Sequence, residues 1–166
     1  MRGRCWKFGD NVSTDHIIAG RFLSTSEPGA LAVHCMEDAR PEFPREVRPG
    51  DIVVAGDNFG CGSSREHATI ALKACRIGAV IASSFARIFF RNAINIGLPI
   101  IESAEAAKAA EDGDDIEVDM DKSRIINHTQ GKTHNFEPFP QEIRDIIASG
   151  GLMKYVKKKM EMEGKD

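Results

Sequence analysis

The stretch from Asp57 to His67 carries side chains and glycines that suit the binding of a small acid. Its two glycines let the backbone adopt positive φ values and approach a ligand closely. The hydroxyls of Ser63 and Ser64 follow at once, and we expect one of them to cap a helix that starts there. Arg65 adds a planar fork that can hold a carboxylate through two hydrogen bonds. Because the first N–H groups of a helix attract anions, the stretch predicts a carboxylate site.

A strand and a helix must hold this stretch between them. Residues 52–55, Ile-Val-Val-Ala, form a short apolar run of the kind found in buried strands. The apolar positions after the stretch recur with the spacing of one helix face: Ala68, Ala71, Leu72 and Cys75. A glycine-rich turn with a serine cap can also serve structure alone, and a short glycine motif does not decide between the two interpretations. The choice therefore depends on the rest of the sequence.

Residues 58–68 read Asn-Phe-Gly-x-Gly-Ser-Ser-Arg-Glu-x-Ala, which resembles the signature of the swivelling domain of the aconitase superfamily. Within that superfamily it is similar to the small subunits of isopropylmalate isomerase and homoaconitase. A second motif of the same family, Ser-Thr-Asp-x-Ile, stands at residues 13–17, about 50 residues upstream. Its polar residues by themselves would predict only a loop with an Asx turn. Two motifs in the family order favour membership of the family.

A third segment, residues 84–97, is also similar to the isomerase small subunits. The resemblance implies that this segment supports the serine motif and the interface with a large subunit. We assign Arg87, Arg91 and Asn95 to that role rather than to substrate contact, the alternative being a solvated face. The helical spacing predicts a buried stripe made of Phe85, Ile88, Phe89, Asn92, Ala93 and Ile96.

Strand and helix patterns alternate along the chain, which argues for a layered α/β domain. Residues 2–8 read as a first strand, and residues 116–120 alternate like an edge strand. A length of 166 residues suits a single domain. The resemblance implies that residues 1–166 form the three-layer β/β/α swivelling fold. We further expect a mobile substrate loop at about 20–30 and a frayed C terminus at 161–166.

The resemblance also implies the reaction, a dehydration and rehydration of a hydroxy dicarboxylic or tricarboxylic acid that moves a hydroxyl between adjacent carbons. Removing a proton next to a carboxylate builds negative charge and requires a positioned base. We predict Ser63 as that base, with Ser64 and Arg65 holding a substrate carboxylate. Thr14 and Asp15 of the second motif would position these groups.

Departure of the hydroxyl requires a Lewis acid. The four cysteines, Cys5, Cys35, Cys61 and Cys75, show no C-x-x-C spacing, so we predict that this chain binds no metal or cofactor of its own. In the resembled family a 4Fe-4S cluster on a separate large subunit supplies the Lewis acid. The chain is therefore expected to be active only with that partner. A reactive thiol at Cys61, beside the helix terminus, is the alternative to a serine base.

The substrate is predicted from the loop at 20–30, which folds over the ligand in the resembled family. A homoaconitase-like loop would carry an arginine within a Tyr-Leu-Arg-Thr run to hold an extra carboxylate. Here the run is Phe22-Leu23-Ser24-Thr25, which favours an apolar substituent. We therefore expect an isopropylmalate, as in leucine biosynthesis. Arg21 could replace the missing cation, so homoaconitase and citramalate-type or methylmalate-type hydro-lyase activities remain alternatives.

Charge and hydropathy exclude other classes of function. A net charge of −3 and a pI near 6.0 provide no basic surface for nucleic acid. The sequence has neither a long apolar run nor a signal-peptide pattern, so we expect no membrane association and a cytoplasmic location. Residues 157–159, three lysines, read as a solvated face. Self-association of the isolated chain is left open. A phosphocarrier domain, with His16 as the candidate residue, is the remote alternative.

Overall fold

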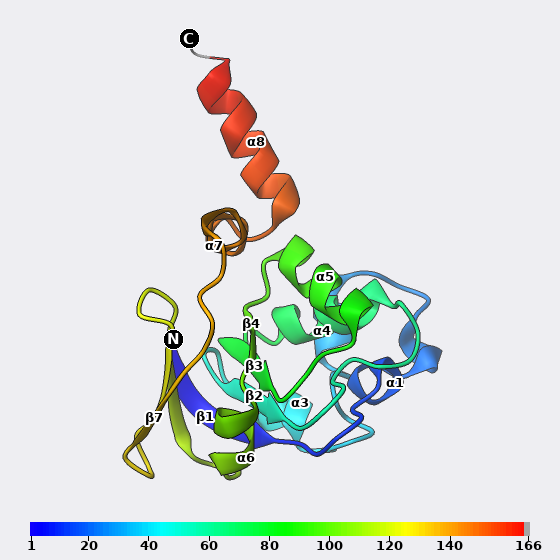
Figure 1. Ribbon diagram of the computed structural model, residues 1–166. Helices are drawn as coiled ribbons and strands as arrows, with labels where there is room; N and C mark the ends of the chain where they lie inside the picture. The colour runs from blue at the N-terminus through cyan, green and yellow to red at the C-terminus, as the bar shows by residue number, and fades with distance from the viewer. Residues whose placement is uncertain (165–166) are drawn as a thin grey trace.

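In the computed structural model, residues 1–164 are described and contain one seven-stranded sheet with the order β4-β3-β2-β1-β5-β6-β7 (Figure 1). The strands are β1 (Arg2–Lys7), β2 (Ile52–Ala55), β3 (Ala79–Ala82), β4 (Ile100–Glu102), β5 (Asp115–Asp119), β6 (Arg124–Asn127) and β7 (Lys132–Asn135). Strands β1 to β4 are mutually parallel, whereas β5, β6 and β7 join them through antiparallel pairings. The parallel half matches the alternation of strand and helix in the sequence.

The side chains of the parallel strands alternate between two apolar cores. Trp6 and Val53 point into one core, and their neighbours Cys5 and Ile52 point into the other. Helices cover the first core. The second core is completed by one helix and by the antiparallel strands, through Ala106, Ile116 and Ile125. Helices, parallel strands and antiparallel strands thus form successive layers, which confirms the predicted three-layer β/β/α arrangement.

The helices are short except where they pack on the sheet or extend away from it. They are α1 (Thr14–Ile17), the 3-10 turn η1 (Gly20–Phe22), α2 (Pro28–Ala32), α3 (Phe43–Glu46), α4 (Glu66–Ala74), α5 (Arg87–Ile96), α6 (Ala104–Ala109), α7 (Gln141–Ala148) and α8 (Leu152–Glu163). Figure 1 shows α4 and α5 beside the parallel strands and α8 extending away from the body. Of the segment expected to be frayed, residues 161–163 are helical and residues 165–166 lie outside the described residues.

Two expectations about individual elements were wrong. The strand expected at an edge, β5, pairs with β1 on one side and β6 on the other, because the chain crosses from α6 to the free side of β1. In α5, Ile88 is 53% exposed, while Phe89, Ala93 and Ile94 are buried. Phe85 precedes the helix, so a periodicity counted from it misplaces the stripe. The edge-to-face contact of Phe89 with Phe59, at 5.2 Å between ring centroids, orients the helix instead.

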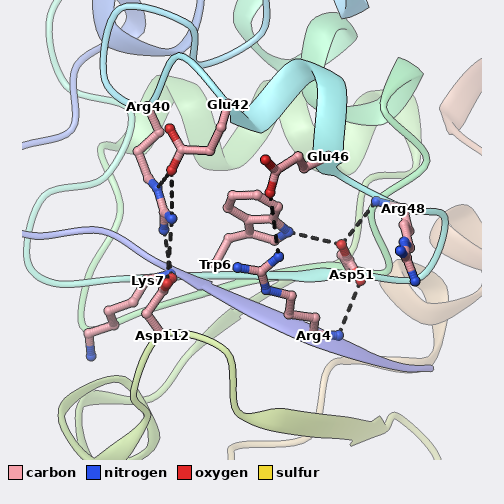
Figure 2. A network of polar contacts seen from close by, with 9 residues as sticks. All are labelled: Arg4, Trp6, Lys7, Arg40, Glu42, Glu46, Arg48, Asp51 and Asp112. Carbon is pink, nitrogen blue, oxygen red and sulfur yellow. Dashed lines mark hydrogen bonds and ion pairs between the residues drawn. The ribbon is translucent and has the colours of Figure 1, made fainter.

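A buried carboxylate fastens β1 to the turn before β2 (Figure 2). Asp51, only 5% exposed, accepts hydrogen bonds from the indole N–H of Trp6 at 2.9 Å and from the backbone N–H groups of Arg4 and Arg48 at 3.1 and 2.9 Å. A buried carboxylate without such donors would be strongly destabilising. Because its partners belong to the framework, we assign Asp51 a structural role.

The same network includes an arginine that joins distant segments (Figure 2). The guanidinium of Arg40 lies 4.7 Å from the ring centroid of Trp6 and forms a 2.6 Å ion pair with Asp112, which precedes β5. Partial burial tends to raise the pKa of Asp112, but hydrogen bonds from Arg40 and from the backbone N–H of Lys7 outweigh burial and lower it. The ion pair therefore stabilises the fold most when Asp112 is ionised.

Candidate active site

The motif between β2 and α4 forms a turn that requires its glycines. Gly60 and Gly62 have φ values of +80° and +99°, as the sequence predicted. An added Cβ at position 60 would lie 2.5 Å from the Cβ of Phe89, so a side chain there would collide with α5. At position 62 it would lie 3.4 Å from the Oγ1 of Thr14. The first glycine serves packing, and the second lets the turn pass close to the second motif.

Neither serine caps the helix, which corrects the expectation from capping rules. Helix α4 begins at Glu66, its N-cap residue is Arg65, and no side chain of the described residues caps it. The hydroxyl of Ser63 is instead 3.3 Å from the hydroxyl of Thr14. Ser63 and Ser64 are both exposed to solvent. Ala68, the third residue of α4, donates its backbone N–H to the carbonyl of Arg65 at 3.3 Å. Without a side-chain cap, the N–H groups before it can still attract an anionic ligand.

The second motif lies directly against the first. Residues Ser13 and Cys61 form a parallel β-bridge, and the backbone N–H of Thr14 donates to the carbonyl of Cys61 at 2.8 Å. Ser13 also caps α1 in a capping box with His16, whose Nδ1 lies 3.0 Å from the backbone N of Ser13. This local cap explains why a segment with a loop-like composition forms a helical turn that presents Asp15.

One ion pair connects the two motifs across the site. The guanidinium of Arg65 pairs with the carboxylate of Asp15, and their side chains are 26% and 66% exposed. Thr14 is 3% exposed and so holds its hydroxyl in a fixed place beside Ser63. The structure thus pairs Ser63 with Thr14 and Arg65 with Asp15, and Ser64 stands between Ser63 and Arg65 in the chain. Their individual roles in binding and catalysis stay predictions.

The loop at 20–30 lies against the C-terminal part of the serine motif. A Cβ added to Gly20 would lie 3.7 Å from Arg65 Nη2 and 3.9 Å from Asp15 Oδ1, so the loop begins at the ion pair. Further along, the hydroxyl of Ser26 lies 3.2 Å from Nε2 of His67 in α4. Sequence reasoning assigned no role to Ser26 or His67, although His67 lies within the motif and could have been chosen for that position. Whether the loop moves stays a prediction.

Arg21 of this loop is held by acids rather than directed toward a ligand. Its guanidinium donates to both carboxylate oxygens of Asp38, at 2.7 and 2.9 Å, and to Glu37 at 3.0 Å. The hydrogen bonds from Arg21 lower the pKa of Asp38 below its usual value. Phe22 stacks on His34 with ring centroids 3.7 Å apart, and the guanidinium carbon of Arg21 lies 4.5 Å from the centroid of the Phe22 ring. Arg21 is therefore already satisfied without a substrate carboxylate.

The remaining predicted specificity residues of the loop differ in their surroundings. Leu23 is partly buried against the first core, Ser24 is exposed, and the Thr25 hydroxyl accepts from the backbone N–H of Glu27 at 3.1 Å.

Among residues 1–164, no group of three His, Cys, Asp or Glu side chains is placed to hold a metal ion. What the site offers is a hydroxyl, an arginine and an open helix terminus, which together can bind a carboxylate and move a proton.

Comparisons with known proteins agree with the motifs. The family model described as Aconitase C-terminal domain matches residues 6–106. The 3-isopropylmalate dehydratase small subunit of Thermodesulfovibrio yellowstonii is 56% identical over 163 residues, covering 98% of this chain and 97% of the relative. That of Aquifex aeolicus is 59% identical over 161 residues, covering 96% of each. The crystal structure of 3-isopropylmalate dehydratase from Methanocaldococcus jannaschii superposes with a TM-score of 0.94 at 50% identity, covering 99% of this chain and 97% of that one.

Proposed function

We propose that this chain, which belongs to the aconitase C-terminal domain family, is the small subunit of a 3-isopropylmalate dehydratase. Such an enzyme is a hydro-lyase of two subunits that serves leucine biosynthesis, so a large subunit is its partner. The near-complete coverage of relatives that carry this name is the observation on which the proposal rests. Homoaconitase-type and citramalate-type activities are the alternatives.

The proposed reaction interconverts 2-isopropylmalate and 3-isopropylmalate by removing and re-adding water. A proton must leave the carbon next to a carboxylate, and we propose that Ser63 takes it. Its exposed hydroxyl is 3.3 Å from that of Thr14, which is fixed by burial and can donate a hydrogen bond to a developing alkoxide. The open N terminus of α4 and the nearby Arg65 add positive potential that favours the ionised form of this weak base.

Arg65 and Ser64 are proposed to hold a substrate carboxylate at the mouth of the turn. The ion pair with Asp15 keeps the guanidinium oriented before substrate arrives, and an arginine fork can bind one carboxylate while it still contacts another. In the loop, Arg21 is occupied by Asp38 and Glu37, which leaves no free cation for the extra carboxylate of a homocitrate-type acid. This arrangement supports an apolar substituent, and hence isopropylmalate.

The hydroxyl that leaves is proposed to be taken by an iron-sulfur cluster of the large subunit, which would act as a Lewis acid. The described residues of this chain do not form a site for such a cluster. The part assigned to this chain is to bind one carboxylate, to exclude water beneath the loop and to hold the proton at Ser63 Oγ.

We further propose that the assembly works in the cytoplasm. No helix within residues 1–164 has the length and apolar character to cross a bilayer.

Reconstitution with the cognate large subunit tests the proposal. We expect the isolated chain to be inactive, the mixture to convert 2-isopropylmalate, and Ser63→Ala to lower kcat by roughly 10²–10⁴-fold, the usual contribution of a general base. Cys61→Ser is the matched control, because it changes a half-exposed neighbour and should stay within about threefold of wild type. Assembly of each variant is checked by size-exclusion chromatography.

Two results would contradict the assignment. Turnover by the purified chain alone would remove the need for a partner, and a loss for Cys61→Ser as large as that for Ser63→Ala would move the chemistry to the thiol. Rates on homocitrate and citramalate, measured in parallel, separate the substrate alternatives. A phosphocarrier role is less compatible with the structure, because His16 Nδ1 is engaged in the capping box of α1.

A further inference from the structure

The first half of the loop at 20–30 is held by the chain that follows it. The guanidinium of Arg21 donates to Asp38 at 2.7 and 2.9 Å, and the ring of Phe22 stacks on that of His34 with centroids 3.7 Å apart. Both partners come after α2 in the chain, on the side of the loop's own continuation. These contacts do not by themselves fix the distance between the loop and the serine motif.

A different contact joins the second half of the loop to that motif. The hydroxyl of Ser26 lies 3.2 Å from Nε2 of His67, and in the described part of the chain this is the one hydrogen bond between residues 20–30 and residues 57–67. His67 is the second residue of α4 and stands two positions after Arg65, the N-cap residue of that helix. We call this contact the Ser26–His67 latch.

Both partners of the latch are attached to ordered backbone. His67 is half-buried in the first turn of α4, and the next residue, Ala68, is fully buried. Ser26 precedes Glu27, the N-cap residue of α2, whose carboxylate accepts from the backbone N–H of Ala30 at 2.6 Å. Helices α2 and α4 pack against each other. The latch therefore connects the starts of two helices that are already neighbours.

The latch and the proposed carboxylate anchor lie at the same end of α4. A Cβ added to Gly20 would lie 3.7 Å from Arg65 Nη2, so the loop leaves the site beside Arg65 and returns to it at His67. A helix holds its side chains in more fixed positions than a loop does. The separation between a carboxylate bound by Arg65 and the side chains of residues 22–25 should then depend on whether the latch is closed.

We infer that His67 is a positioning residue, whose hydrogen bond to Ser26 holds the loop where it accepts the apolar substituent of the substrate. This inference rests on the proposed function and deepens it, because it names a residue outside the loop that sets how the loop meets the ligand. His67 acts through the loop and touches no reacting atom. Its loss should therefore weaken substrate binding more than it slows the chemical step.

The size of the effect follows from the loss of one hydrogen bond. If substrate binds to the latched form, KM rises as the latched fraction of the protein falls. The net contribution of one hydrogen bond limits that rise, so we expect an about fivefold higher KM for 2-isopropylmalate in Ser26→Ala and in His67→Ala. The value of kcat should stay within about twofold of wild type, because binding and not the transition state is affected.

Two replacements of His67 separate the latch from other roles. Glutamine can place its amide near the position of Nε2, whereas the shorter asparagine places it near Nδ1. His67→Gln should therefore restore most of the wild-type KM, and His67→Asn should not. Since both partners belong to one bond, Ser26→Ala combined with His67→Ala should be no worse than either change alone. His128→Ala, which removes a histidine that contacts Glu117 of β5, is the matched control and should leave KM unchanged.

Kinetics are measured on the enzyme reconstituted with its cognate large subunit, and a second measurement needs no substrate. Hydrogen–deuterium exchange of the full-length chain reports the opening of the loop directly. The backbone N–H groups of residues 22–25 should exchange about two- to fivefold faster in Ser26→Ala, His67→Ala and His67→Asn than in wild type and His67→Gln. Circular dichroism verifies that each variant keeps its helix content.

Other outcomes overturn the inference. Unchanged KM and unchanged exchange in both alanine variants would show that the latch does not hold the loop. Rescue by His67→Asn instead of His67→Gln, or a loss for His67→Ala that Ser26→Ala does not share, would assign His67 a direct contact with the ligand. A lower kcat at unchanged KM would place it in the chemical step.

Failure of the proposed function gives a different result. If the reconstituted wild type does not convert 2-isopropylmalate, the proposed function fails, and the role of His67 in binding that substrate fails with it even where exchange reveals the latch. If wild type is active and only the predictions for Ser26 and His67 fail, the proposed function stands and this inference is wrong.

Discussion

Substituting alanine at the two motif glycines should have unequal effects on stability. Both residues have positive φ, and an L-residue there costs about 1–2 kcal/mol. For Gly62→Ala this strain is the main cost, because the new methyl group would meet only Thr14 Oγ1, at 3.4 Å. For Gly60→Ala the methyl group would lie 2.5 Å from the Cβ of Phe89, an atom that cannot move without the helix backbone. Overpacking adds about 1–3 kcal/mol, so Gly60→Ala should cost about 2–5 kcal/mol in total.

Urea denaturation of the isolated chain, followed by circular dichroism, measures the difference. With a denaturant slope of about 2 kcal/mol per molar urea, the midpoint should fall by about 1–2.5 M for Gly60→Ala and by about 0.5–1 M for Gly62→Ala. A double-mutant cycle with Phe89→Ala isolates the part of the collision made by the ring, because it removes Cγ and Cδ2 of Phe89, which would lie 2.2 and 2.5 Å from the new methyl group, and keeps Cβ. The two changes together should cost less than the sum of the single changes, by a share of the overpacking cost of about 1–3 kcal/mol. Equal midpoint shifts for the two glycine variants, or strict additivity in the cycle, would refute the reasoning.

Two other groups give measurable effects. The pKa of Asp112 is lowered in the folded state, so the stability gained from its pairing with Arg40 is present above the unfolded pKa near 3.9 and is lost as pH falls through the folded value. Arg40→Met should therefore lower the free energy of unfolding by about 1 kcal/mol at pH 6, a modest value because Asp112 is partly exposed. The difference in unfolding free energy between wild type and variant should become smaller by pH 2.5. A difference that does not change with pH contradicts this prediction. Among the thiols, Cys61 is half-exposed and the other three are buried, and burial raises the pKa of Cys5 to about 12. A thiol reagent should then modify one group quickly in the native protein, and Cys61→Ser should abolish that fast phase; survival of the fast phase would place the reactive thiol elsewhere.

Features that depend on near neighbours in the chain could be predicted well. The buried strand at 52–55 followed from a short apolar run, and the positive φ values of Gly60 and Gly62 followed from their place in a tight turn. Helix α4 buries Ala68 and Leu72 as its spacing indicated. The order of the two motifs also indicated the family, which the comparisons confirmed.

Features that depend on distant partners could not be predicted in the same way. Capping rules offered Ser63 a place at the start of α4, but the hydroxyl of Thr14, 49 residues away, lies beside it instead. Helical periodicity placed Ile88 inside, but the contact of Phe89 with Phe59 turned it outward.

The amino-acid sequence by itself determined the local conformations and the chemical groups of the site, because backbone preferences and residue types act over a few residues. Only the tertiary structure decided that Asp15 pairs with Arg65, that Arg21 is held by Asp38, and that α8 leaves its apolar face uncovered. The physical reason is that each of these contacts is made or left open by chain segments far apart in the sequence, and their energies depend on a packing that no short window of residues specifies.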